Sequence, residues 1–279
     1  DLIDLQNKII NSKAKYLLLS HMRGHIADMD KVTSLCKDNS VKLIEDCAHT
    51  MGAKWRGIRS GNFGLVSAFS TQTYKHLNSG EGGFLTTNNP KLAAKAIVSS
   101  GSYMLYNRHG SIPSEKTFKE TRLDSPNYSG RIDQIRACIL RAQLPNLEKN
   151  IQRWNDLYKT LFDKLTQIKG LSIPNRDCQE FYVGSSMQFR THDLNDNTIP
   201  IFIDACLKRG VDLKWFGNKE PKAFTSRYDS WTYIKDLPVL EKTLHYLSKT
   251  IDMRIPLTFT QDDCVTIAKI IRNELEKLG

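Results

Sequence analysis

The first hundred residues alternate between short apolar runs and segments with helical periodicity. Such runs predict strands, and the segments between them predict helices, with Asp28 as an N-cap and Pro90 in a first helical turn. The predicted strands are residues 16–20, 41–45, 66–69 and 83–87, and the predicted helices are residues 2–12, 29–37 and 90–98. Strands buried on both faces and separated by helices indicate a parallel or mixed sheet in an α/β layer fold.

The second half of the chain has a different organisation. Residues 100–130 are rich in Ser, Gly and Tyr and predict a polar loop, and a long amphipathic stretch follows that Pro145 should kink or divide. Beyond it the pattern predicts strands at 183–190, 211–215 and 251–255 and helices at 199–209, 239–247 and 261–278. We therefore expect a large domain over residues 1–130, linking helices over 131–166, and a small α+β domain over 167–279.

Composition narrows the class of protein. The 279 residues are 40% hydrophobic, which is enough for one large core or two modest ones. No stretch approaches the roughly 18 uninterrupted apolar residues of a membrane span. The six cysteines are scattered without a Cys-x-x-Cys pair, which favours free thiols in a reducing cytoplasm over disulfides or a zinc site.

The formal net charge of +10 raises the question of nucleic-acid binding. Such binding needs a concentrated basic patch, whereas Lys and Arg are spread along this whole chain. An anionic cofactor and an anionic metabolite explain the charge better than a nucleic acid does.

Two polar clusters follow predicted strands. Asp46 and His49 come after the strand at 41–45, and Ser70 and Lys75 come after the strand at 66–69. In open α/β sheets, ligands collect beyond the carboxyl ends of the strands. An amine that is partly desolvated, or close to other cations, loses its proton readily and can form a Schiff base with a carbonyl. An acid, an imidazole, a hydroxyl and an amine are the set that a pyridoxal phosphate enzyme requires.

Each of these residues also has an ordinary structural explanation. An acid at a strand end commonly caps the next helix, and most lysines are solvated at the surface. Lys75 stands out because a glycine-rich turn at residues 80–83 follows it, where backbone can approach a ligand closely. That turn lacks the spacing of a nucleotide-binding fingerprint.

His21 and His25 have the i, i+4 spacing that binds a metal on a helix. Gly24 between them and Asp28 after them indicate a loop instead, and no third ligand accompanies them.

Several segments, in this order, resemble the DegT/DnrJ/EryC1/StrS family of pyridoxal-phosphate-dependent sugar aminotransferases. The matching segments are His21-x-x-Gly24 with Asp28-Met-Asp30, Ile44-Glu-Asp46-x-Ala-His49-x-x-Gly-Ala53, Phe69-Ser70-x4-Lys75-x4-Gly80-Glu-Gly-Gly83, Arg131-Ile-Asp-x-x-Arg-Ala137, Gln143-Leu144 and Pro256-Leu257. Together with the closing helix they extend over essentially the whole chain.

The resemblance implies a fold type I aminotransferase that works as a homodimer. Lys75 would be the Schiff-base lysine and proton carrier, Asp46 would pair with the pyridine nitrogen, and Ser70 would bind the phosphate. His49 stands where most members carry Gln and can donate to the phenolic oxygen of the cofactor. Ser129 stands where many members carry an Asn that reaches the phosphate of the partner subunit.

Within the family, three runs most resemble the enzymes that aminate the lipopolysaccharide sugar acid 3-deoxy-manno-octulosonate at carbon 8, namely residues 20–25, 101–110 and 214–217. Glutamate would be the amino donor and the 8-oxo sugar acid the acceptor. The runs contain Tyr103, Arg108, His109 and Lys214, cationic and phenolic groups that suit a carboxylate.

Three alternatives remain open: a nucleotide-sugar aminotransferase of the same family, a truncated non-catalytic homologue or regulator, and a dehydratase. Lys75 argues against the dehydratase, in which His replaces the Schiff-base lysine.

Family members carry roughly a hundred further residues before the point at which Asp1 falls, a length within one ordinary domain. We therefore expect this chain to be a fragment that binds the cofactor weakly or not at all by itself.

Overall fold

The structure, a computed structural model, describes residues 1–279 except 102–109, 111, 223–226, 234 and 279. The chain divides into two compact units. Unit 1 comprises Asp1–Lys149 and Asp177–Val183, and unit 2 comprises Asn150–Arg176 and Gly184–Gly279. The expected boundaries at residues 130 and 166 stay predictions.

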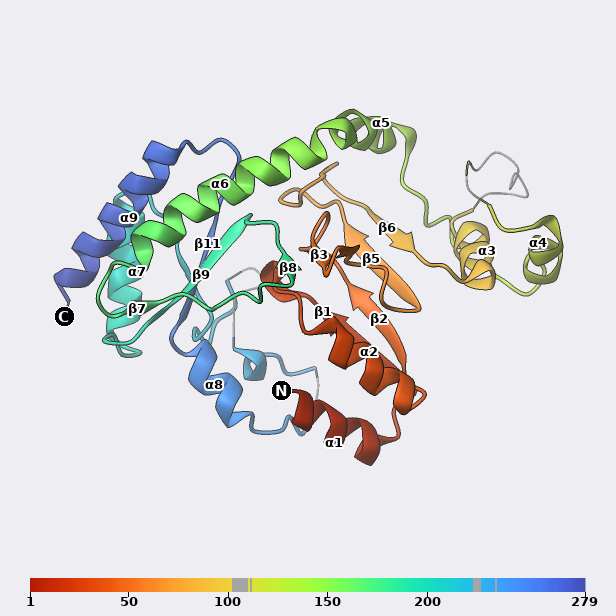
Figure 1. Ribbon diagram of the computed structural model, residues 1–279, viewed down its shortest axis with the longest axis horizontal. Helices are drawn as coiled ribbons and strands as arrows, with labels where there is room; N and C mark the ends of the chain where they lie inside the picture. The colour runs from red at the N-terminus through yellow and green to blue at the C-terminus, as the bar shows by residue number, and fades with distance from the viewer. Residues whose placement is uncertain (102–109, 111, 223–226, 234, 279) are drawn as a thin grey trace. The chain divides into compact units, whose positions relative to one another are not determined.

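Unit 1 is built on a four-stranded sheet with the order β1-β2-β5-β6 (Figure 1). Its strands are β1 (Tyr16–Ser20), β2 (Lys42–Asp46), β5 (Val66–Ser70) and β6 (Gly83–Thr86). The first three run parallel to one another, and β6 is antiparallel to β5. The prediction of a mixed, mostly parallel sheet is confirmed.

Three helices of unit 1 begin at side-chain caps. They are α1 (Leu2–Ser12), α2 (Met29–Asp38) and α3 (Pro90–Ser99), and their N-caps are Asp1, Asp28, which the sequence predicts, and Asn89. In each of them a side-chain oxygen of the cap accepts a hydrogen bond from an N–H group of the first turn, which would otherwise lack a partner.

The prediction that residues 100–130 form only a loop is wrong. A short helix, α4 (Glu115–Thr121), begins after the N-cap Ser114. Its Phe118 is buried against Ala94 and Val98 of α3. One apolar side chain in two turns gives too weak a periodicity to predict a helix. The helix is stabilised instead by its tertiary contact with α3.

Pro145 divides the long amphipathic stretch, as predicted. The segment consists of α5 (Gln134–Gln143), the 3₁₀ turn η3 (Leu144–Asn146) and α6 (Leu147–Leu165). Along α6, side chains such as Ile151, Leu161 and Leu165 are buried on one face. Each contributes about 1.5–3 kcal/mol through the apolar area that it removes from water.

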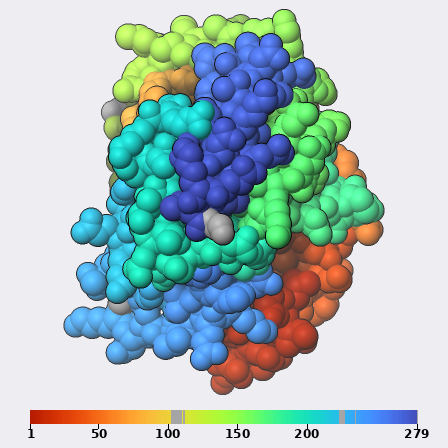
Figure 2. All heavy atoms as spheres, turned by 90° about the vertical axis from the view of Figure 1, so that its left-hand side faces the viewer, coloured from red at the N-terminus to blue at the C-terminus, as the bar shows by residue number. Residues whose placement is uncertain are grey.

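Unit 2 contains an antiparallel sheet with the order β10-β11-β9-β7. Its strands are β7 (Leu171–Ser172), β9 (Ser186–Thr191), β10 (Lys214–Trp215) and β11 (Thr250–Arg254). The strand predicted at 211–215 is reduced to its last two residues. The helices are α7 (Thr198–Lys208), α8 (Glu241–Leu247) and α9 (Gln261–Glu276), with the 3₁₀ turn η4 (Tyr228–Ser230) before α8. In Figure 2, α9 lies between α7 and α6.

A third sheet, with the order β4-β3-β8, lies in unit 1 and was not predicted. Its strands are β3 (Lys54–Trp55), β4 (Ile58–Arg59) and β8 (Glu180–Phe181). The Lys54 Nζ lies 5.4 Å from the centre of the Phe181 ring. Strands of two residues show no alternation that could predict them. The antiparallel pairing of β3 with β8, with hydrogen bonds from the N–H groups of Ile26 and Arg56 to Glu180 and Gln179, joins residues 177–183 to unit 1.

Among the described helices, none combines the length and the apolar character that crossing a bilayer requires. The six cysteines are free thiols.

Candidate active site

Three parallel strands bring polar side chains to one edge of the unit 1 sheet. β1 ends at Ser20, β2 ends at Asp46 and β5 ends at Ser70, and the register places Ser20 beside Asp46. Parallel strands share the direction of their carboxyl ends, so the clusters predicted after β2 and β5 lie at this common edge.

The Asp46 carboxylate is half-buried and held on both oxygens. Ser20 Oγ donates to Asp46 Oδ2 at 2.8 Å, and the backbone N–H of Ala48 donates to Oδ1 at 3.0 Å. These bonds fix the carboxylate at the sheet edge. Ser20 was not among the predicted site residues.

Lys75 and His49 meet, although 26 residues separate them in sequence. The distance from Lys75 Nζ to His49 Nε2 is 3.1 Å, and both side chains are half-buried. The backbone N–H of Lys75 donates to the carbonyl of Gln72 at 3.0 Å, which anchors the loop that carries the amine.

The surroundings of His49 keep its imidazole neutral. Burial, and next to it the positive charges of Lys75, Arg23 and His76, lower the pKa of His49 from its usual value of 6.5 to about 3, and Asp46 opposes this only partly. A neutral imidazole can accept a hydrogen bond from a cation, and the contact with Lys75 uses this capacity.

The turn after Lys75 is held by hydrogen bonds across its base. The N–H groups of Thr71 and Thr73 donate to the carbonyls of Gly82 and Gly80, each at 2.9 Å. Gly82 has φ +128°, and an added Cβ would lie 2.9 Å from Thr71 Oγ1 and 3.0 Å from Ile132 Cγ2. The glycine is therefore required both by the backbone conformation and by space.

Gln143 of α5 fastens the same loop from outside. Its Oε1 accepts from the backbone N–H of Asn78 at 3.0 Å, and its Nε2 donates to the Asn78 carbonyl at 2.6 Å. These two hydrogen bonds connect the lysine loop to the end of α5.

Glu45 has a structural role that the sequence did not reveal. Pleating turns it to the face opposite its neighbour Asp46, the face that also carries buried Leu43, and its side chain is 0% exposed. The groups that donate to it at 2.8–3.3 Å are His21 Nε2, the backbone N–H groups of Gly61, Phe63 and Gly64, and Ser67 Oγ. Burial pushes the pKa of Glu45 upward, but these hydrogen bonds, led by that of His21, outweigh it and hold the pKa below its usual value.

The histidine pair forms a turn, as predicted. η1 (Met22–Gly24) contains Arg23 at φ +55°, and a Cβ on Gly24 would lie 3.0 Å from the His49 carbonyl oxygen. His21, Glu45 and Cys47 bring ligand atoms within 4.8 Å of one another. Glu45 already accepts from backbone donors, and burial, with the Glu45 charge, raises the pKa of Cys47 to about 12, so this cluster suits a hydrogen-bond network better than a metal.

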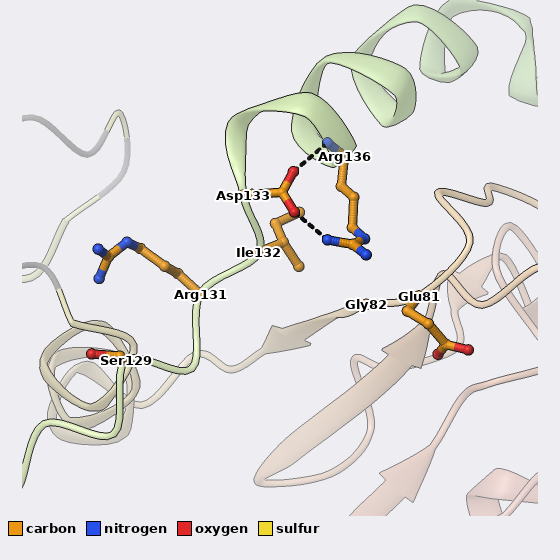
Figure 3. Close-up of a pocket in the computed structure, with 7 residues that line it drawn as sticks. All are labelled: Glu81, Gly82, Ser129, Arg131, Ile132, Asp133 and Arg136. Atoms are coloured by element: carbon orange, nitrogen blue, oxygen red, sulfur yellow. Dashed lines mark hydrogen bonds and ion pairs between the residues drawn. The ribbon is translucent and has the colours of Figure 1, made fainter.

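Ser70 and Ser129, the two serines predicted to bind phosphate, lie in different places. Ser70 Oγ accepts from the backbone N–H of Gln72 at 3.2 Å and remains at the sheet edge. Ser129 is exposed at φ +50° and lines a separate pocket of about 520 Å³ with Glu81, Arg131 and Arg136. Figure 3 shows Ser129 and Arg131 on the segment that leads into α5, with Glu81 beside the glycine turn.

The predicted carboxylate-binding residues Tyr103, Arg108 and His109 lie outside the described residues. Lys214 is in β10 of unit 2, where its Nζ lies 3.7 Å from Asp212 Oδ2.

The donor set at the sheet edge fits pyridoxal phosphate. A carboxylate oriented by two hydrogen bonds suits a protonated ring nitrogen, and a half-buried amine beside a neutral imidazole suits a Schiff-base lysine. Asp46 and Lys75 would hold the cofactor, with Ser70 available to its phosphate.

Sequence comparison finds one family and several relatives that this chain is similar to. The pattern of the DegT/DnrJ/EryC1/StrS aminotransferase family matches residues 3–217. GDP-perosamine synthase of Escherichia coli O157:H7 is 32% identical over 168 residues, which are 59% of this chain and 43% of that protein. dTDP-3-amino-3,4,6-trideoxy-alpha-D-glucose transaminase of Streptomyces venezuelae is 32% identical over 171 residues, which are 61% of this chain and 42% of that protein. The matched part of the chain thus spans less than half the length of these relatives.

The fold agrees with solved structures. The putative sugar aminotransferase Spr1654 from Streptococcus pneumoniae, solved in its PMP form, aligns with a TM-score of 0.81 at 17% identity, covering 100% of this chain and 73% of that chain. At this identity the likeness concerns the fold, which is that of pyridoxal-phosphate-dependent aminotransferases. The predicted fold class is confirmed.

Proposed function

Because the chain belongs to the DegT/DnrJ/EryC1/StrS aminotransferase family, we propose that it acts as a pyridoxal-phosphate-dependent sugar aminotransferase. The observation that carries this proposal is the meeting of Asp46, His49 and Lys75 at the carboxyl edge of the unit 1 sheet. The reaction would move an amino group from an amino acid to a keto or aldehyde sugar.

Each residue of the candidate site has its own role in the proposed reaction. Bound pyridoxal phosphate supplies a ring that withdraws electrons from the carbon that loses its proton. The Asp46 carboxylate would keep the ring nitrogen protonated, and Ser20 and Ala48 hold that carboxylate in one orientation. Lys75 would be the residue that holds the cofactor through its aldehyde and, when its amine is free, the group that carries the proton of the substrate carbon. Ser70 would bind the phosphate.

We propose glutamate as the amino donor and an 8-oxo-3-deoxy-manno-octulosonate as the acceptor, which would place the protein in lipopolysaccharide sugar biosynthesis in the cytoplasm. The support is the resemblance of the runs around Arg23 and Lys214 to the octulosonate transaminases. A nucleotide-linked keto sugar is the alternative acceptor, favoured by the names of the relatives above. A homodimer would let Ser129 reach the phosphate site of the partner subunit.

Trapping of the lysine tests the enzymatic proposal. The full-length parent protein is incubated with pyridoxal phosphate and reduced with borohydride, and the labelled peptide is mapped by mass spectrometry. We expect the label on Lys75, none at that peptide in Lys75→Ala, and full labelling in the control Lys91→Ala, whose side chain is exposed on α3. A label on another lysine, or no label, contradicts the proposal and favours a non-catalytic homologue.

The two acceptors are separated by the second half-reaction. Glutamate should first bleach the visible absorption of the cofactor. Addition of the octulosonate aldehyde should then restore it, and a nucleotide-linked keto sugar should not. The reverse result would establish the nucleotide-sugar alternative.

A further inference from the structure

The contact between Lys75 and His49 fixes which atom carries the ring proton. A lysine ammonium group has three donors and no acceptor. With Lys75 as an ammonium group, Nζ donates to Nε2 at 3.1 Å, so this ring nitrogen accepts and the proton of the neutral ring sits on Nδ1.

Among the described residues, the groups whose charges act most on His49 belong to three segments. Lys75 and His76 lie in the loop after β5, Arg23 lies in η1, and Asp46 ends β2. Lys75 and Arg23 are cations, and Asp46 is the carboxylate in this set. A second ring proton would therefore place two cations 3.1 Å apart in a half-buried site, which costs free energy.

We propose that His49 is a positioning residue for Lys75, in which Nε2 accepts a hydrogen bond from Nζ and holds the amine at the sheet edge. The catalytic meaning of this role rests on the function proposed above. It differs from the role implied by the family resemblance, in which the residue at this position donates to the phenolic oxygen of the cofactor.

A neutral acceptor suits a lysine that must both take and release a proton. A carboxylate in the same place would stabilise the ammonium form and hold its proton. A neutral imidazole accepts a hydrogen bond from either the ammonium or the amine form, so it orients Nζ without fixing its charge. No bond is made or broken at His49.

The tautomer can be measured without any enzymatic turnover. Long-range ¹H–¹⁵N NMR of the full chain, freed of cofactor, distinguishes a protonated from an unprotonated Nε2. We expect His49 as the Nδ1–H tautomer from pH 7.5 to pH 5, and we expect Lys75→Met to raise its pKa. An Nε2–H tautomer at neutral pH, or a titration that Lys75→Met leaves unchanged, would overturn the proposal.

A variant series tests whether the contact positions the amine. His49→Gln keeps an acceptor in its amide oxygen, whereas His49→Leu removes it. The rate at which the cofactor-free full-length parent protein captures pyridoxal phosphate is followed by stopped-flow absorbance. We expect His49→Gln to stay within about threefold of the parent and His49→Leu to lose about tenfold or more, the value of one hydrogen bond to a charged group.

Capture by His49→Leu at the parental rate would contradict the positioning role. If this variant does not fold, the NMR tautomer decides. This outcome can be distinguished from that of borohydride trapping. The Nδ1–H tautomer of His49 with no label on Lys75 would refute the aminotransferase proposal and support the positioning role of His49. A labelled Lys75 with the Nε2–H tautomer of His49 would support the aminotransferase proposal and refute the positioning role.

Discussion

Acidification should destabilise the cofactor-free protein through His49. The pKa of this residue falls from 6.5 to about 3 on folding, because of burial and the charges of Lys75, Arg23 and His76. Between these two values the unfolded chain binds a proton at His49 that the folded chain does not. Stability from this group is therefore complete above pH 6.5 and is lost progressively as the pH falls toward 3.

The size of the effect follows from the two pKa values. The unfolded histidine has its usual pKa of 6.5, so at pH 5, about 1.5 units lower, it is almost fully protonated. One pH unit corresponds to about 1.4 kcal/mol, so the free energy of unfolding is about 2 kcal/mol lower at pH 5 than at pH 7.5. This figure hardly depends on the folded value as long as that value lies below about 4, since the folded histidine then stays neutral at pH 5.

His49→Gln isolates this contribution because it keeps an acceptor for Lys75 and removes the titration. Urea unfolding of both cofactor-free proteins is followed by circular dichroism at pH 7.5 and pH 5.0. The wild-type free energy of unfolding should fall by about 2 kcal/mol more than that of the variant. Equal losses in the two proteins would show that His49 titrates normally in the folded state and that the reasoning about its surroundings is wrong.

Three further changes test the scaffold around Lys75. Glu45→Gln should destabilise the protein by about 3 kcal/mol or more in urea unfolding, because backbone donors would face an amide, while Glu148→Gln at an exposed ion pair should cost less than about 1 kcal/mol. Ser20→Ala should slow the glutamate half-reaction about fivefold through a less ordered Asp46, and Ser20→Thr should restore it. Gly82→Ala should lower borohydride labelling of Lys75 severalfold, whereas Gly110→Ala, where a Cβ meets no atom of the described residues within 4 Å, should leave it unchanged.

Apolar runs and caps were sufficient to predict most of the fold. The strand 16–20 and the helix 2–12 have the bounds that the sequence predicts, because each is a continuous pattern closed by a local signal. The helix α4 and the β4-β3-β8 sheet escaped prediction because a contact distant in sequence stabilises each of them. Such contacts leave no periodicity to read.

The candidate site also has one part that the sequence predicts and one part that it does not. The strand ends predicted that Asp46 and Lys75 would come to one edge of a sheet. The meeting of His49 with Lys75 could not be predicted, since it depends on how two loops, 26 residues apart, turn beyond their strands. Ser129, whose role came from resemblance, lines another pocket in the single chain. Its proposed role in a dimer stays a prediction.

Glu45 and Asp46 show why the roles of two adjacent acids cannot be inferred from the sequence alone. Both are carboxylates at the end of one strand, and pleating sends them to opposite faces. Glu45 is enclosed by donors and carries its charge as part of the folded core, so its function is to hold the turn at residues 61–64 and His21 in place. Among the described residues, Asp46 accepts from two donors, and it stays half-exposed at the edge. The difference in hydrogen bonding, which follows from a shift of one residue in the pleat, makes one carboxylate a structural anchor and leaves the other available to a ligand.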